Sequence, residues 1–343
     1  MRSQKSSQKV TIVDVAKRAG VSIKTVSRVL NSEPNVRADT REKVLKAAKA
    51  LHYQPNPSAR GLAGNRSFSI GLLYENPQEF GYVKDALNGV IGTCEAEGYS
   101  LLMRPCGEEV DSEEVRKFVA QTRVDGAVLT APVCDEPKVT DLLKELGVPF
   151  AQLAPKAPRS EWISVQCNDE EASYAMTDYL ISLGHRRVGF IKGHPDHGAT
   201  EKRLAGYRRC LADHDMPFDK TLVMQGYFDF ESGQRCARKL LELPNPPTAI
   251  FASNDDMAAG VIFTARERGI GVPDELSVAG FDDSPAASHT WPPLTTVKQP
   301  IVEMAARATQ RLIGQLRGVG EEGDEEIFTC ELIVRRSTAK RGD

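Results

Sequence analysis

The 343-residue sequence lacks the features that mark several large classes of protein. No apolar run approaches the roughly 20 residues of a transmembrane helix, and the polar start contains no signal-peptide core. The seven cysteines are an odd number without a C-x-x-C pair, which is typical of reduced thiols rather than of a disulfide framework. We therefore expect a soluble, cytoplasmic protein with no membrane partner.

Motifs of catalysis and cofactor binding are also missing. The sequence contains no G-x-x-x-x-G-K-[ST] loop, no G-x-G-x-x-G and no nucleophile elbow. His194 and His197 in "HPDH" could suggest a metal, but a short loop around Pro195 lacks the further ligands that a site needs. His185 in "LGHRR" is expected in a turn rather than in acid–base chemistry. We therefore expect no enzyme, no catalytic residues, no metal and no cofactor.

The net charge of −3 conceals a strong division along the chain. Residues 1–66 contain 14 Lys and Arg against 4 Asp and Glu, a net charge of +10. Residues 67–343 contain 30 against 43, a net charge of −13. A basic head on an acidic body predicts a polyanionic partner for the head alone.

The head begins with "TIVDVAKRAGVSIKTVSRVLN", which predicts two short helices joined by a tight turn. Thr11 is a natural N-cap, and Asp14 three residues later completes a capping box. Gly20 can adopt the left-handed conformation that ends a helix, and Ser22 can cap a second helix over residues 23–30.

A third helix follows in "VRADTREKVLKAAKALHYQPN", with Val44, Leu45, Ala48 and Leu51 as its expected apolar stripe. Three short helices with a tight turn between the first two indicate a helix-turn-helix, whose second helix would enter a DNA major groove. That helix offers donors for base edges and phosphates, namely Lys24, Thr25, Ser27 and Arg28. The alternative is a basic helical hairpin that binds another protein.

These motifs, with "VRADTREKV" and "LHYQPNPSARGLAG", resemble the DNA-binding headpiece of the lac-repressor (LacI/GalR) family of bacterial transcription regulators. The match runs without a gap from Thr11 to about Arg66. The resemblance implies a headpiece over 1–54 and a hinge over 55–66, with a hinge helix from Asn56 to Ala63 and Leu62 as a minor-groove wedge. A plain flexible linker is the alternative. The implied DNA-binding residues are Thr11, Ser22, Lys24, Thr25, Ser27, Arg28, Asn31, Tyr53, Asn56, Ala59 and Leu62.

From Phe68 onward, short apolar strands alternate with helices, which predicts an α/β fold of parallel, doubly wound sheets. One set includes "FSIGLLY", "SLLMR", "GAVLT" and "PFAQLA", and a second includes "RVGFIKG", "LVMQGYF", "TAIFASN" and "LSVAGFDD". The resemblance implies two subdomains of the periplasmic-binding-protein type, within a core over 67–343. We expect a first lobe over about 67–165 and 298–325 and a second over about 166–297 and 326–343, with Ile301 to Leu316 as a first-lobe helix.

Polar groups at strand ends indicate a ligand site in the cleft between these lobes. The resemblance implies effector contacts by Arg203, Asn254 and Asp282, with Phe228 covering the ligand. We expect Tyr74 and Asn168 to bind the effector as well. The alternative is that Asp255 and Asp282 only cap helices or close loops. Where family members often carry an aspartate, this sequence has Cys167 in "VQCND", which puts a ligand contact at that position in doubt. If Asp282 fails as a ligand group, Asn168, Asn254 and the first-lobe loop from Tyr74 to Tyr82 are the next places to search.

The basic head decides between the possible functions of such a core. We expect a transcription repressor that binds a palindromic operator as a homodimer, because the end "RRSTAKRGD" lacks a leucine-repeat helix for tetramers. An Arg–Asp pair and an aromatic face suit a sugar and carbohydrate-utilisation genes. A purine- or nucleoside-responsive regulator and a sugar-binding receptor are the alternatives, and the sequence leaves open whether the effector induces or corepresses.

Overall fold

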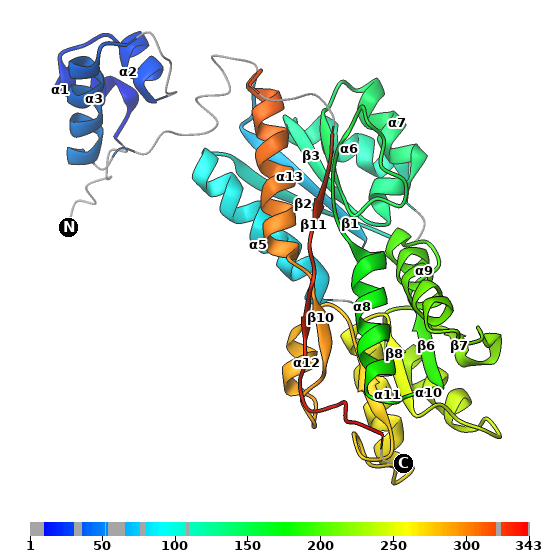
Figure 1. Cartoon of the computed structure of the whole chain (residues 1–343). Helices are drawn as coiled ribbons and strands as arrows, with labels where there is room; N and C mark the ends of the chain where they lie inside the picture. Colours follow the sequence, from blue (N-terminus) through cyan, green and yellow to red (C-terminus); the bar gives the residue numbers. More distant parts are fainter. Residues whose placement is uncertain are drawn as a thin grey trace, which may run out of the picture. The chain divides into compact units, whose positions relative to one another are not determined.

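The computed structural model describes residues 10–30, 36–51, 53, 66–75, 80–107, 110–319 and 324–341. It divides into a head unit, Met1–Phe68, and a core unit, Ser69–Asp343. Figure 1 shows the head as helices alone and the core as helices around sheets. None of the described helices combines the length and the apolar character needed to cross a bilayer.

The head contains three helices whose ends match the sequence signals (Figure 1). They are α1 (Ile12–Ala19), α2 (Ile23–Leu30) and α3 (Ala38–Ala50). Asp14 Oδ2 accepts hydrogen bonds from the Thr11 amide at 2.8 Å and from its hydroxyl at 2.7 Å. Gly20 has a left-handed φ of 66° after α1, and Ser22 Oγ accepts a hydrogen bond from the Thr25 amide at 3.1 Å. The predicted capping signals are therefore confirmed.

Small apolar side chains form the core of the head. The buried residues are Val15, Ala16, Val26, Val29, Val44, Ala47 and Ala48. The prediction that Leu45 belongs to this stripe is wrong, because its side chain is 49% exposed. Residues 44, 47, 48 and 51 lie on one helical face, whereas residue 45 lies about 100° away from residue 44.

The first lobe is a six-stranded parallel sheet in the order β11-β5-β4-β3-β1-β2. Its strands are β1 (Ser69–Glu75), β2 (Ser100–Cys106), β3 (Gly126–Thr130), β4 (Phe150–Leu153), β5 (Ile163–Cys167) and β11 (Asp324–Phe328). Helices α5 (Phe80–Glu97) and α13 (Ile301–Leu316) pack against each other, as Figure 1 shows. The remaining elements are α6 (Ser112–Thr122), α7 (Pro137–Glu145) and the 3₁₀ helix η1 (Val133–Asp135). The expected return of residues 301–316 to this lobe is confirmed, because α13 packs on β3, β4 and β5.

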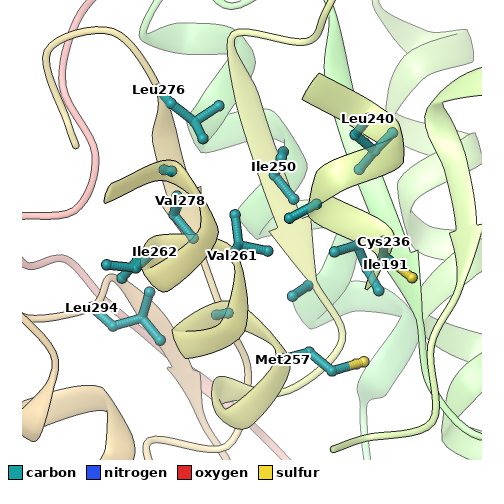
Figure 2. Packing of buried hydrophobic residues seen from close by; sticks show 14 of the residues in the cluster. Ile191, Cys236, Leu240, Ile250, Met257, Val261, Ile262, Leu276, Val278 and Leu294 are labelled. Atoms are coloured by element: carbon teal, nitrogen blue, oxygen red, sulfur yellow. The ribbon is translucent and has the colours of Figure 1, made fainter. Parts of the chain in front are cut away.

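The second lobe is a four-stranded parallel sheet in the order β7-β6-β8-β9, between two pairs of helices. Its strands are β6 (Val188–Lys192), β7 (Val223–Gln225), β8 (Ala249–Ala252) and β9 (Ser277–Ala279). Its helices are α8 (Asp169–Ser182), α9 (Gly198–Asp213), α10 (Phe230–Leu241), α11 (Asp255–Glu267) and α12 (Pro285–His289), with the 3₁₀ helix η2 (Lys220–Leu222). Alternate residues of β8 face opposite layers: Phe251 packs with Phe190 and Tyr207, and Ile250 with Leu240 and Val261 (Figure 2).

The chain crosses between the lobes three times. It leaves the first sheet after β5, returns through β10 (Thr296–Lys298) into α13, and leaves again after β11 into β12 (Glu331–Ile333). Strands β10 and β12 pair antiparallel, so two crossings run side by side. The first sheet extends to Cys167 and to Phe328, two or three residues beyond the expected lobe boundaries at 165 and 325.

Two glycines of α5 offer a matched test of the α5–α13 contact. A Cβ added at Gly89 would lie 2.2 Å from the Val302 carbonyl oxygen, whereas one added at Gly92 would meet nothing within 4 Å. We expect Gly89→Ala to destabilise the core by about 1–3 kcal/mol through overpacking. Gly92→Ala should stabilise it by about 0.5–1 kcal/mol, because alanine is the better helix former. Thermal and urea unfolding measure both, and equal effects would contradict this packing.

Candidate ligand cavity and nucleic-acid interface

A cavity lies between the lobes where strand order reverses in each sheet, beyond the carboxyl ends of β1 and β3 and of β6 and β8. Its volume is 40 Å³. It is lined by Tyr82, Ala131, Ala154, Asp169, His197, Ala199, Arg203, Phe228, Asp282 and Gln299. Three of the six predicted effector residues, Arg203, Phe228 and Asp282, therefore come together here.

Arg203 of α9 is the central charge of the cavity and is only 3% exposed. Its Nε donates to Asp169 Oδ1 at 2.8 Å, and its Nη1 donates to the Ser253 carbonyl oxygen and lies 3.7 Å from Asp282 Oδ1. Its guanidinium stacks 3.6 Å from the Phe281 ring centroid. Burial opposes the charge, but the Asp169 and Asp282 carboxylates raise the pKa of Arg203, so it stays protonated.

Asp282 shares this arginine with Asp169, which is the better placed partner. Gln299 Nε2 donates to Asp282 Oδ1 at 2.6 Å. Burial raises the pKa of Asp282 to about 7, against the lowering effects of Arg203 and Gln299. Near neutral pH this carboxyl group can therefore either accept a hydrogen bond or donate one to a bound ligand.

Aromatic rings form one wall of the cavity. Phe228 has a left-handed φ of 64°, and its carbonyl oxygen accepts a hydrogen bond from Asn254 Nδ2 at 2.7 Å. The His197 ring lies 5.3 Å from the Phe228 ring. His197 Nε2 is also 3.6 Å from Glu75 Oε2 of the first lobe, and the closeness of this imidazole lowers the pKa of Glu75.

Tyr82 of α5 brings an unsatisfied hydroxyl to the same cavity. Its Oη is buried and has no hydrogen-bond partner in the described part of the chain. Burial raises the pKa of Tyr82, so the hydroxyl stays protonated. A buried donor without a partner is costly and rare, and a polar atom of a ligand would satisfy it. The sequence indicated Tyr82 only as the last residue of a first-lobe loop that could contain further ligand contacts.

The other predicted effector residues lie outside the cavity lining. Asn254 caps α11, because its Oδ1 accepts from the Met257 amide at 3.0 Å. Asn168 Oδ1 accepts from the Cys330 amide at 2.8 Å, which ties two lobe crossings together. Tyr74 lies at the end of β1, opposite Pro105 of β2. Their roles as effector contacts stay predictions.

Asp255 has a structural role, the alternative to ligand binding, because it closes a loop. It accepts hydrogen bonds from the Thr296 hydroxyl at 2.6 Å and from the Ser284 amide at 2.7 Å. Sequence reasoning missed Asp169, His197 and Gln299 as cavity residues. Asp169 directly follows the strand "ISVQC" and its Asn168, so its position at a strand end was the signal that could have found it.

The predicted DNA-binding residues of α2 lie on the face away from the head core. Lys24 and Arg28 are exposed, and Thr25 and Ser27 are half-buried. The Thr25 hydroxyl lies 2.9 Å from that of Ser22. Thr11 caps α1 and is exposed, and Tyr53 packs against the head core. Asn31, Asn56, Ala59, Leu62 and the expected hinge helix lie outside the described residues, so they stay predictions.

One trio of possible metal ligands comes together among the described residues, away from the cavity: Asp178, Cys210 and His214. His214 Nε2 lies 2.6 Å from Asp178 Oδ1, a hydrogen bond near the surface. Burial raises the pKa of Cys210 to about 12, which disfavours the thiolate that metal binding needs. His194 and His197 have adjacent rings, 5.6 Å apart, in the loop before α9.

Two models of known protein families match this chain, one in the head unit and one in the core unit. The model of bacterial regulatory proteins of the lacI family matches residues 11–56, and that of the periplasmic binding protein-like domain matches residues 177–338. The probable HTH-type transcriptional repressor ExuR of Bacillus subtilis (strain 168) is 32% identical over 96% of this chain and 99% of its own length.

Solved structures of transcription regulators are similar to this chain over almost its whole length. The complex of the transcriptional regulator CelR with cellobiose is 32% identical, with a TM-score of 0.74 over 96% of this chain and 99% of that one. The lac repressor dimer bound to operator and the anti-inducer ONPF is 28% identical, with a TM-score of 0.76 over 97% of this chain and 100% of that one.

The raised pKa of Asp282 predicts how stability changes with pH. An aspartate of pKa 3.8 in the unfolded chain and about 7 in the folded protein binds its proton more tightly when folded. Its ionisation therefore costs nothing below pH 3.8 and destabilises the fold increasingly as the pH rises through 7. Between about pH 5 and pH 8, the wild type should lose about 2–3 kcal/mol relative to Asp282→Asn. Urea unfolding at constant ionic strength measures this, and parallel pH profiles would contradict it.

Proposed function

Because the chain belongs to the lacI family of bacterial regulatory proteins, it is a DNA-binding transcription regulator, and we propose that a small sugar-like ligand in the interlobe cavity controls it. It acts as a repressor of carbohydrate-utilisation genes and binds a near-palindromic operator as a dimer. The lac repressor dimer on its operator, to which the whole chain is similar, supports this arrangement. A protein that binds operator DNA works in the cytoplasm.

The observation that carries the ligand proposal is the combination of groups around one cavity. Arg203 supplies fixed donors, Asp282 a group that can donate or accept, and Tyr82 an unsatisfied hydroxyl. Phe228 supplies an apolar face. Vicinal hydroxyls pair well with a carboxyl–guanidinium set, and a sugar ring stacks on an aromatic face. The similar CelR structure holds cellobiose, which supports the same class of ligand.

The size of the cavity explains how ligand binding would be coupled to DNA binding. Small-molecule sites enclose about 300–1,000 Å³, whereas this cavity measures 40 Å³. The lobes close it through contacts between His197 and Glu75 and between Lys202 Nζ and the Pro155 carbonyl oxygen, 3.3 Å apart. A sugar must therefore move the lobes apart or select a more open arrangement, and a ligand that favours one arrangement shifts the population toward it. If that arrangement binds operator poorly, the ligand is an inducer.

The DNA-binding role of α2 can be tested with two single-charge variants. Arg28→Ala should weaken binding by about 1–3 kcal/mol if the side chain reads a base. Lys49→Ala removes one positive charge from the exposed side of α3 and should lower the affinity for DNA far less. Gel-shift titration at fixed salt, on a duplex selected by the wild-type protein from a random pool, measures both. Equal losses in the two variants would remove α2 from sequence recognition.

The ligand class and the cavity can be tested together by thermal shift on the full chain. Cellobiose, free hexoses, hexuronic acids and purine bases form the panel, and we expect a sugar to raise the melting temperature. Tyr82→Phe removes only the unpaired hydroxyl and should weaken that ligand by about 0.5–1.5 kcal/mol. Tyr174→Phe, in α8 and outside the cavity lining, is the matched control and should bind as the wild type does.

Three outcomes separate the alternatives. Stabilisation by purine bases alone would replace the sugar proposal with a nucleobase. Unchanged affinity in Tyr82→Phe would remove this hydroxyl from the site. Full ligand response in a folded Asp282→Ala protein would refute the cavity as the effector site.

A further inference from the structure

Two packed helices of the second lobe bring three different metal-ligating groups together. The ligand atoms of Asp178, Cys210 and His214 all lie within 4.8 Å of one another. Asp178 belongs to α8, Cys210 belongs to α9, and His214 directly follows α9. None of the three lines the ligand cavity, and Asp178 lies about 13 Å along the axis of α8 from Asp169, which does. The cluster is therefore separate from the proposed effector site.

The packing of α8 on α9 fixes the positions of these groups. A Cβ added at Gly206 of α9 would lie 2.1 Å from the Glu170 carbonyl oxygen of α8, so the two backbones approach closely. The His214 amide donates to the Cys210 carbonyl oxygen at 3.2 Å, which continues the helical turn beyond the end of α9. Residues four apart lie on the same face of a helix, so Cys210 and His214 both face Asp178.

The thiol of this cluster is a buried polar group that lacks a partner. Cys210 is 0% exposed, and its Sγ has no hydrogen-bond partner in the part of the chain that the structure describes. By contrast, thiols that donate a hydrogen bond are those of Cys106, Cys134, Cys167 and Cys236. The imidazole and the carboxylate of the cluster have side chains that are 36% and 49% exposed, so an ion can reach the thiol from solvent between them.

We propose that Asp178, Cys210 and His214 bind one Zn²⁺ ion, with water as the fourth ligand, and that this ion ties α8 to α9. Carboxylate, thiolate and imidazole are the ligand types of protein zinc sites, and zinc bonds of about 2.0–2.3 Å place the ligands of one ion roughly 3–4 Å apart. The cluster reaches this arrangement by small rotations of its two exposed side chains. Sulfur and nitrogen ligands disfavour Mg²⁺ and Ca²⁺, which prefer oxygen. The proposal goes beyond the proposed function and does not depend on it.

Zinc binding is an exchange of a metal ion for protons. Because burial raises the pKa of Cys210 to about 12, its thiol carries a proton when no metal is bound. Zn²⁺ deprotonates a thiol that coordinates it, so this proton passes to solvent as the Zn–S bond forms, and its removal weakens binding. His214 Nε2 and Asp178 Oδ1 now lie 2.6 Å apart and would separate to about 3.3 Å around the ion. The ion then takes the place of their shared hydrogen.

The first test uses Co²⁺ as a spectroscopic probe of the same ligands. Full-length protein without an affinity tag is kept reduced with a phosphine, freed of metal with a chelator and titrated with Co²⁺. We expect one equivalent to produce the charge-transfer absorption of a cobalt–thiolate bond, and Zn²⁺ to remove it. Cys210→Ala should abolish this absorption, whereas Cys94→Ala, at a buried cysteine of α5, should retain it. No saturable absorption in the folded wild type, or an unchanged one in Cys210→Ala, would overturn the proposal.

The second test examines the other two ligands and remains decisive if Cys210→Ala does not fold. Thermal unfolding is measured over a range of Zn²⁺ concentrations, because an ion that binds only the folded state raises the melting temperature. Asp178→Asn and His214→Gln should each need at least about tenfold more Zn²⁺ than the wild type for the same rise. His289→Gln, at an exposed histidine that ends α12, is the matched control and should respond as the wild type does. Equal responses in all four proteins would refute these ligands. Neither test uses a sugar or DNA, so failure of the proposed function would leave both results unaffected.

Discussion

The buried charge of Arg203 is the constraint on which the second lobe and its cavity depend. A guanidinium removed from water must be paired and hydrogen-bonded, and leaving it unpaired would cost several kcal/mol. It has four partners at three places in the chain: Asp169 at the start of α8, the Ser253 carbonyl after β8, and the Phe281 ring with Asp282 after β9. The arginine therefore fixes the ends of these elements relative to α9.

This network contains two carboxyl groups for one arginine. Asp169 has the short hydrogen bond, and Asp282 is left with a more distant arginine and a neutral Gln299. Burial then drives Asp282 toward its protonated form. The same imbalance that would destabilise an empty site leaves a hydrogen-bonding group ready for a ligand, which is typical of functional sites.

Local signals in the sequence predicted the head helices and most strand–helix units well. Thr11, Gly20 and Ser22 cap or end helices through contacts with residues less than about one or two turns away. Neighbouring residues therefore determine their conformation. The prediction that Leu45 is buried is wrong, because packing against α1 and α2 determines which face of α3 is buried. Strand β11 was missed as well: "DEEIF" is too polar to indicate a buried strand, and it forms a partly exposed edge strand by pairing with β5.

The cavity was only partly predictable for the same reason. Arg203, Phe228 and Asp282 follow motifs that could be matched by resemblance. Gln299 comes from a crossing, and Tyr82 from a helix of the opposite lobe, so tertiary structure alone brings them to the cavity. Asn254 follows a strand, which suggested a ligand contact, and its side chain bonds the Met257 amide and the Phe228 carbonyl, so its role toward a ligand stays a prediction.

The Phe228 ring of the cavity wall packs directly on the backbone of Gly193, and this contact has an evolutionary consequence. A Cβ added at Gly193 would lie 2.0 Å from the Phe228 ring, so the two positions are not free to vary separately. A side chain at residue 193 is compatible with this wall only if residue 228 becomes smaller or turns away. Descendants of this protein that reshape this wall by adding a side chain at residue 193 must therefore also change or reorient the side chain at residue 228.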